Sequence, residues 1–95
     1  MAAYFVAELT VIDPDLFERY KPLAEAAIKS MGGEYIVRGG DRSVVEGTVA
    51  GSRTVILKFE NVDAIHQWYN SDVYAPALKM RLESTIATAY IVDGL

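Results

Sequence analysis

The sequence of 95 residues contains no cysteine and a single histidine. Without cysteine the protein has no disulfide, no thiolate nucleophile and no cysteine-ligated metal, which fits a reducing, cytoplasmic compartment. One histidine argues against a transition-metal site and against a Ser/His/Asp triad, because these need several ligands or a partnered imidazole. His66 also falls off the apolar stripe of its predicted helix, so we expect it to be exposed. This position argues against haem ligation and leaves a general base as a minor alternative. We therefore expect no metal and no cofactor.

Positive charge and long apolar runs are also scarce. Nine Lys and Arg residues against thirteen Asp and Glu residues give a net charge of −4, without a basic cluster, and this argues against nucleic acid as a partner. No apolar run approaches the roughly 20 residues of a membrane span, and Glu8 interrupts the apolar N-terminus, so we expect neither a membrane segment nor a secretory signal.

What the chain has in surplus is apolar residues, which make up 52% of it. A length of 95 residues predicts one domain, spanning residues 1–95, and a domain of this size buries only part of its surface. A second subunit would cover the apolar surplus.

Hydrophobic periodicity predicts the element order β-α-β-β-α-β, which is the order of the ferredoxin-like plait. This is an α+β fold in which helices cover one face of a four-stranded antiparallel sheet. We expect Asp13 to cap the first helix, Pro22 to kink it and Gly32 to end it. The predicted strands are residues 3–12, 34–38 (which 43–46 could continue), 54–60 and 86–92, and the predicted helices are 14–31, 62–69 and a segment from Ser71-Asp72 to about Glu83.

The two predicted central strands have one apolar face and one mixed face. The mixed face carries Tyr4, Val6 and Glu8 from the first strand, and Ile56 and Lys58 from the third. Such a face is too apolar to lie open to water and too charged for an ordinary core. We expect it to pack against a second copy of the chain, forming a homodimer whose barrel leaves a small-ligand cavity with a few polar groups.

Two glycine pairs, Gly32-Gly33 and Gly39-Gly40, bracket a five-residue strand. A phosphate cradle would need a helix directly after the glycines or a following Lys-Ser/Thr. The first pair ends a helix instead, and the second leads into Asp41-Arg42 and strand-like residues. We interpret the pairs as turns, with a bulge or sharp bend at the second.

A set of motifs spread over nearly the whole chain resembles the domain of unknown function 1330 family. The motifs are Val11-x-Asp13-Pro14, Gly33-x-Tyr35-x-Val37-Arg38-Gly39-Gly40, Glu46-Gly47, Arg53, Phe59, Trp68-Tyr69-x-Ser71-x-x-Tyr74 and Arg81. The resemblance implies a ferredoxin-like fold of the dimeric α/β-barrel superfamily, in which two sheets pack face to face across a two-fold axis. That superfamily includes cofactor-free monooxygenases, lactone isomerases, haem enzymes and ligand-sensing domains, so the resemblance implies no single activity.

Three arginines are the first candidates for a binding site. Arg38, Arg53 and Arg81 could converge on a carboxylate or another anion, which a guanidinium binds with two hydrogen bonds. Alternatively, each could pair with Glu46, Glu34 or a helix C-terminus, because acidic partners are plentiful.

Two further groups have a functional and a structural interpretation. Glu8 and Lys58 could form an acid/base pair with shifted pKa values on the mixed face, or a buried or rim salt bridge. Trp68, Tyr69 and Tyr74 could line a pocket for an aromatic or apolar ligand, or could simply pack in the core or an interface.

These observations lead to two hypotheses. The first is a homodimeric, cofactor-free protein that binds a small anionic or aromatic molecule between sheet and helices or in the barrel, and that could be an enzyme. The second is an accessory dimerisation module with a solidly packed barrel. The candidate ligand-binding residues are Arg38, Arg53, Glu46, Trp68, Tyr69, Tyr74, Arg81, Glu8 and Lys58.

Overall fold

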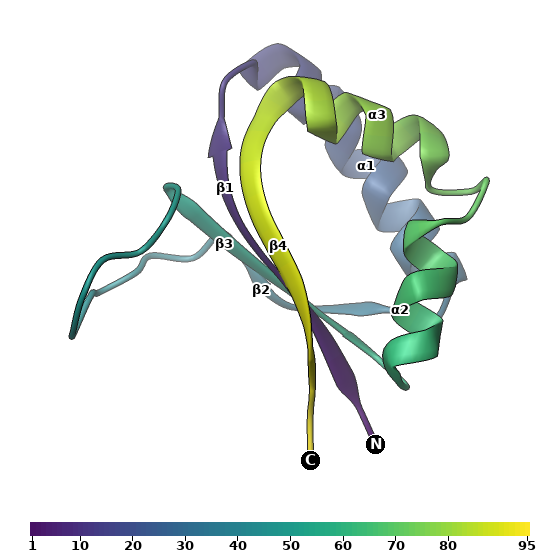
Figure 1. Ribbon diagram of the computed structural model, residues 1–95. Coiled ribbons are helices and arrows are strands. Elements are labelled where there is room, and N and C mark those ends of the chain that lie inside the picture. The colour runs from purple at the N-terminus through teal and green to yellow at the C-terminus, as the bar shows by residue number, and fades with distance from the viewer.

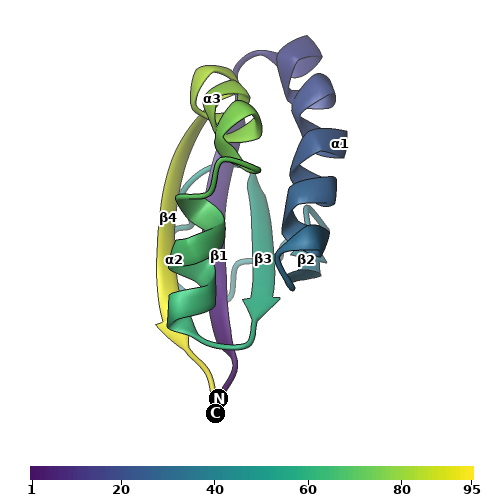
Figure 2. The same ribbon diagram turned by 90° about the vertical axis from the view of Figure 1, so that its right-hand side faces the viewer.

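Four strands form one antiparallel sheet, and three helices cover one of its faces in a computed structural model that describes residues 1–95 (Figure 1). The sheet order β2-β3-β1-β4 places β1 and β3 in the centre, and this confirms the predicted ferredoxin-like α+β arrangement. In Figure 2, α1 lies over the β2 side of the sheet, whereas α2 and α3 lie over β1 and β4. The elements are β1 (Ala3–Val11), α1 (Pro14–Ser30), β2 (Glu34–Arg38), β3 (Arg53–Phe59), α2 (Val62–Tyr69), α3 (Ala75–Ser84) and β4 (Thr85–Asp93).

Helix α1 begins and ends where the sequence predicts. The Asp13 side chain accepts a hydrogen bond from the Leu16 backbone nitrogen at 3.2 Å, and Pro14 occupies the first turn, where its missing N–H is not needed. Pro22 lies inside the helix, which continues past it to Ser30. Gly32 then adopts a φ of +85°, a left-handed conformation that glycine reaches without a steric cost.

The core lies between the helices and the apolar faces of β1 and β3, as predicted. Trp68 of α2 is its centre: its ring contacts Phe5 at 5.2 Å, Phe59 at 5.4 Å and Tyr74 at 4.4 Å between centroids. Trp68 is 1% exposed, so these edge and tilted aromatic contacts fix the position of α2 on the sheet.

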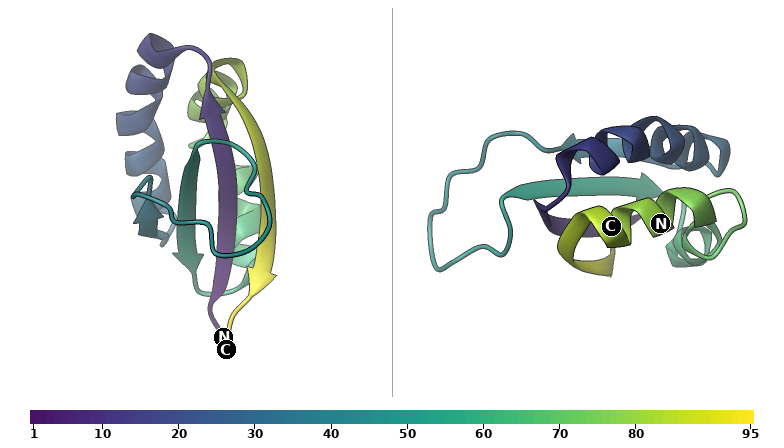
Figure 3. Two further views of the ribbon diagram at one scale, coloured as in Figure 1. Left: turned by 90° about the vertical axis from the view of Figure 1, so that its left-hand side faces the viewer. Right: turned by 90° about the horizontal axis from the view of Figure 1, so that it is seen from above.

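The prediction that residues 43–46 continue the second strand is wrong. Residues 39–52 form an irregular loop that extends from the sheet on the side opposite the helices (Figure 3). The last ladder hydrogen bond joins the Gly39 nitrogen to the Thr54 carbonyl at 2.8 Å, and Gly39 then turns the chain with a φ of +72°. The bulge itself lies earlier, between Tyr35 and Val37, rather than at the second glycine pair.

The start of the last helix is also corrected. Ser71 does not cap α3: its hydroxyl donates to the Trp68 carbonyl at 2.8 Å and accepts from the Tyr74 nitrogen at 3.1 Å, so it closes a turn after α2. Helix α3 begins at Ala75, with Pro76 in its first turn. This placement removes the conflict that Pro76 would create deeper in a helix.

No helix covers the other face of the sheet, and β4 presents apolar side chains there. Tyr4, Val6 and Glu8 of β1 pair with Val92, Tyr90 and Thr88 of β4 and share this face with them. Tyr90 is 53% exposed and Ile86 is 67% exposed. Among the helices, none combines the length and the hydropathy that crossing a membrane requires.

Candidate functional site

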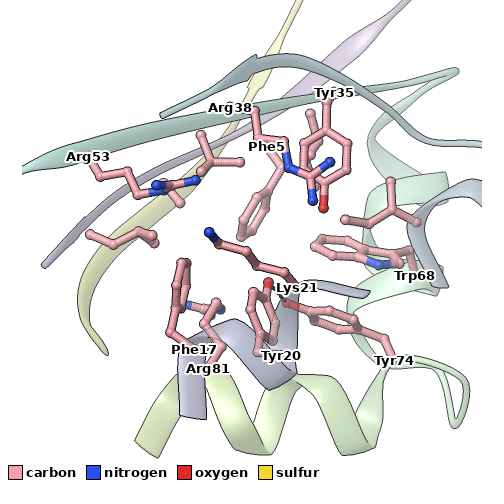
Figure 4. A pocket seen from close by; sticks show the side chains of 15 residues that line it. Phe5, Phe17, Tyr20, Lys21, Tyr35, Arg38, Arg53, Trp68, Tyr74 and Arg81 are labelled. Carbon is pink, nitrogen blue, oxygen red and sulfur yellow. Dashed lines mark hydrogen bonds between the residues drawn. The ribbon is translucent and has the colours of Figure 1, made fainter. Parts of the chain in front are cut away.

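A cavity of about 40 Å³, called the inner cavity below, lies between the helices and the sheet (Figure 4). At roughly 10–15 Å³ for each water molecule, it has room for about three waters. Fifteen residues line it, and they come from β1, α1, β2, β3, α2, α3 and the turn before α3. The side chains with polar atoms are those of Tyr20, Lys21, Tyr35, Arg38, Arg53, Trp68, Tyr74 and Arg81, and the other lining side chains are apolar.

Arg81 is the most deeply buried charge at the inner cavity. It lies on the buried face of α3 with Ala77 and Ser84, and only 5% of it is exposed. Its Nε and Nη1 atoms are buried without a hydrogen-bond partner, and none of the four ion pairs of the protein includes it. A guanidinium stays charged in proteins, and burying an ion without a partner costs several kcal/mol. The cavity therefore contains a positive charge that the chain does not neutralise.

Arg53 provides a second guanidinium without an acidic partner. Its Nε is buried and unpaired, and its Cζ lies 5.4 Å from the centre of the Phe17 ring, a cation–π distance. The guanidinium lies against Gly39, where a Cβ would come within 2.5 Å of Cζ. The glycine thus allows both the turn after β2 and the position of Arg53.

Two tyrosines and the indole add neutral donors. The hydroxyl oxygens of Tyr20 and Tyr74 are 3.0 Å apart, and one hydrogen bond between two hydroxyls leaves the hydrogen of one of them free. Burial raises the pKa of Tyr20 and of Tyr74, and the Arg81 guanidinium offsets part of each rise in pKa, so both hydroxyls stay protonated near neutral pH. The Nε1 of Trp68 is buried without a hydrogen-bond partner.

The two cations at the rim of the inner cavity already have acidic partners on α1. Arg38 contacts Glu25 at 3.3 Å and lies 4.2 Å from the centre of the Tyr35 ring, and Lys21 contacts Glu18 at 2.9 Å. These pairs are partly exposed, so each adds little stability. The contrast is between neutralised cations at the rim and unneutralised cations inside.

The comparisons with known proteins identify a family. The family model described as "Domain of unknown function (DUF1330)" matches residues 2–95. The chain belongs to the DUF1330 family. No curated protein matches the sequence.

Solved structures share the fold of this DUF1330 chain at low sequence identity. A protein of unknown function from Rhodopseudomonas palustris has a TM-score of 0.78 and 13% identity, over 99% of this chain and 82% of that one. A dimeric ferredoxin-like protein of unknown function from Jannaschia sp. CCS1 has a TM-score of 0.73 and 10% identity, over 99% of this chain and all of that one. SnoaB, a cofactor-independent oxygenase from Streptomyces nogalater, has a TM-score of 0.69 and 13% identity, over 99% and 93% of the two chains. At these identities the likeness concerns the fold.

The inner cavity of the DUF1330 chain brings together five of the nine predicted site residues: Arg38, Arg53, Trp68, Tyr74 and Arg81. The sequence analysis left Glu46, Glu34 or a helix C-terminus as partners of the arginines. Arg38 pairs with Glu25 instead, and Arg53 and Arg81 form no ion pair. Arg81 does lie in the last turn of α3.

Glu46 and Tyr69 do not line the inner cavity. Glu46 is exposed in the loop 39–52, where the chain has left the sheet. The ring centroid of Tyr69 lies 5.9 Å from those of both Phe5 and Trp68. Tyr69 also borders a separate surface pocket, together with His66 and Tyr90. His66 is exposed, as its position off the apolar stripe predicts.

Glu8 and Lys58 lie on the opposite face of the sheet and do not form a pair. Glu8 faces Thr54 and Lys58 faces Tyr4, four positions apart, which is about 13 Å at 3.3 Å per residue. The partners of Glu8 are Arg42 at 2.9 Å and Thr54 at 2.6 Å. The acid/base interpretation of Glu8 and Lys58 is therefore wrong, and the salt bridge forms with Arg42 instead.

Ten of the fifteen residues that line the inner cavity were not predicted as site residues, among them Phe17, Tyr20 and Tyr35. Phe17 and Tyr20 belong to the apolar stripe of α1, and Tyr35 lies in β2 on the helix-facing side. The sequence signal that could have identified them is a tyrosine in an apolar stripe, because its buried hydroxyl needs a hydrogen-bond partner. Periodicity alone does not show whether that partner is another side chain or a ligand.

Proposed function

We propose that this DUF1330 protein binds a small organic anion in the inner cavity. The observation that carries the proposal is the buried guanidinium of Arg81, which has no acidic partner and lies in the same cavity as the unpaired Nε of Arg53. An anion between them would compensate both charges and would accept hydrogen bonds that now have no acceptor.

The volume of the inner cavity favours a small anion over an aromatic ligand. About 40 Å³ holds roughly three waters, whereas drug-sized ligands occupy pockets of about 300–1,000 Å³. The lining contains no Asp, Glu or His, so it offers positive charge and hydrogen-bond donors rather than a carboxylate or imidazole base. A cofactor-free reaction here would depend on stabilising negative charge that develops on the bound molecule. The similarity to SnoaB, a cofactor-independent oxygenase, keeps that reaction class open for test.

The proposal is tested by thermal shift and isothermal titration calorimetry with a panel of two- to four-carbon carboxylates. We expect a saturable rise of the melting temperature for some members, and loss of that rise in Arg53→Met, which keeps most of the aliphatic stem. If no carboxylate changes the melting temperature, and Arg53→Met lowers the free energy of unfolding by about 3 kcal/mol, the alternative of an accessory module with structural arginines is favoured.

We also propose that the protein is a cytoplasmic homodimer formed through the face of the sheet that no helix covers. Ile86 and Tyr90 expose apolar surface there, and the Jannaschia relative of the same fold is described as dimeric. The absence of cysteine is consistent with the cytoplasm.

Native mass spectrometry tests the dimer and reports any retained ligand in the same spectrum. Ile86→Glu should give a monomer, because it would place carboxylates in the interface. Leu82→Glu is the matched control, since Leu82 is exposed to a similar extent on α3 and should leave the subunit count unchanged. A monomeric parent protein at micromolar concentration would contradict the proposal.

A further inference from the structure

The inner cavity contains two chemically different sets of unused donors. One set is the charged pair of guanidiniums from Arg53 and Arg81. The other set is neutral: the indole Nε1 of Trp68, and the one hydroxyl hydrogen that the Tyr20–Tyr74 hydrogen bond does not use. A simple carboxylate would satisfy only the first set.

Both sets line the same inner cavity, whose volume of about 40 Å³ is small enough for one molecule to meet both. Trp68 packs on Tyr74 with ring centroids 4.4 Å apart, and the charge of Arg81 acts on both Tyr20 and Tyr74. In Figure 4, Arg53 and Arg81 lie on one side of the cavity and Trp68 and Tyr74 on the other, with Tyr20 between them. A ligand whose carboxylate lies at the guanidiniums therefore directs its next atoms toward the neutral donors.

The neutral set also restricts the second group of the ligand. An indole N–H only donates, and the free tyrosine hydrogen also needs an acceptor. A carbonyl oxygen has two lone pairs and no hydrogen of its own, so it can accept from both. A second carboxylate is a poorer fit, because the rim cations Arg38 and Lys21 already have glutamate partners.

We infer that the inner cavity binds a 2-oxo acid of two or three carbons, with its carboxylate at Arg53 and Arg81 and its oxo oxygen at Trp68 and the tyrosine pair. The inference rests on the proposed function and names its ligand class. The size agrees, because about three waters of space corresponds to roughly 90–100 Å³ of liquid volume, and a small acid of this length needs a similar volume.

Calorimetry with three acids of equal carbon number tests the inference. Pyruvate carries the oxo oxygen, lactate replaces it by a hydroxyl, and propionate lacks it. We expect pyruvate to bind about tenfold more tightly than propionate, because two neutral hydrogen bonds are gained, and lactate to fall between them. Equal affinities for pyruvate and propionate would overturn the inference while the proposed function stands. If neither acid binds, both the inference and small-anion binding lose their support.

Hydroxyl-deletion variants separate ligand recognition from general loss of structure. In the double variant Tyr20→Phe/Tyr74→Phe, the ratio of pyruvate affinity to propionate affinity should fall to about one third of its parent value or less. Tyr69→Phe is the matched control, because Tyr69 lies outside the inner cavity, and its ratio should stay unchanged. If the double variant binds both acids more weakly and by the same factor, the tyrosines do not recognise the oxo oxygen, and the inference of a 2-oxo acid ligand is overturned.

Discussion

Replacing Arg81 by methionine should make the ligand-free protein more stable. The variant keeps much of the aliphatic stem and removes a guanidinium that is 5% exposed and lacks an acidic partner. Exchanging buried charged groups for apolar ones of similar volume often stabilises proteins by about 1–4 kcal/mol. Water in a cavity of about 40 Å³ would hydrate part of the guanidinium, so we expect the lower end, about 1 kcal/mol. For a domain of this length, that corresponds to a rise of about 4–8 °C in the melting temperature.

The order of stabilities should invert when the anion is added. An anion at a hundred times its Kd stabilises the parent protein by about 2.7 kcal/mol, whereas Arg81→Met should gain almost nothing. The parent then becomes the more stable protein by about 1.7 kcal/mol, which is the difference between the two effects. Urea denaturation at fixed protein concentration, with and without ligand, measures all four free energies.

A loss of more than about 2 kcal/mol in ligand-free Arg81→Met would refute this reasoning, because it would show that the guanidinium makes stabilising contacts inside the chain. Arg38→Met is the control. Arg38 is partly exposed and paired with Glu25, so its replacement should change the ligand-free stability by no more than about 0.5 kcal/mol.

Two further predictions concern groups around the same cavity. Because burial raises the pKa of Tyr20 and Tyr74 above the usual 10.0, the unfolded chain loses these protons first. The free energy of unfolding should therefore keep its full value below about pH 10 and fall as the pH rises above it. The fall should be less steep in Tyr20→Phe. Urea denaturation between about pH 9 and pH 11 measures both slopes. An equal slope in the variant would exclude Tyr20 as a source of the fall. Gly39→Ala and Gly47→Ala should each cost about 1–2 kcal/mol, because both glycines have a φ of +72°. Only the alanine at position 39 would displace Arg53, so only this variant should weaken carboxylate binding in calorimetry; equal affinities in the two would contradict the role of Gly39.

Much of the fold can be predicted from the sequence, because the side chains buried on one face of a strand or helix recur with the period of that element. The apolar alternation in β1 and β3 predicts which side meets the helices, and Asp13 predicts where α1 begins. The strand-like residues 43–46 mislead because strand formation depends on a neighbouring strand as well as on residue type. Gly39 turns the chain away from β3, so these residues have no strand to pair with.

The site was less predictable because its defining property is an absent contact. Scarce arginines in an acidic chain can be noted from composition, but whether each one meets a carboxylate depends on packing between distant elements. Arg42 shows the limit: the sequence predicts a turn there, yet its side chain contacts Glu8 of β1 at 2.9 Å and the Gly51 carbonyl at 2.7 Å. The hydrogen bond between Tyr20 of α1 and Tyr74, which precedes α3, likewise joins residues that are 54 positions apart in sequence.

The distribution of charge supports a binding role for the inner cavity. The chain has thirteen acidic residues, and four ion pairs join Glu8, Glu18 and Glu25 to basic side chains outside the core. None of these carboxylates reaches Arg53 or Arg81. A carboxylate from the chain at that position would be a permanent partner and would occupy the space that an anion needs. A buried guanidinium without an acidic partner instead lowers the stability of the ligand-free protein, and an arriving anion recovers that free energy as affinity. The inversion expected for Arg81→Met measures this exchange directly, because the same side chain should destabilise the empty protein and stabilise the occupied one.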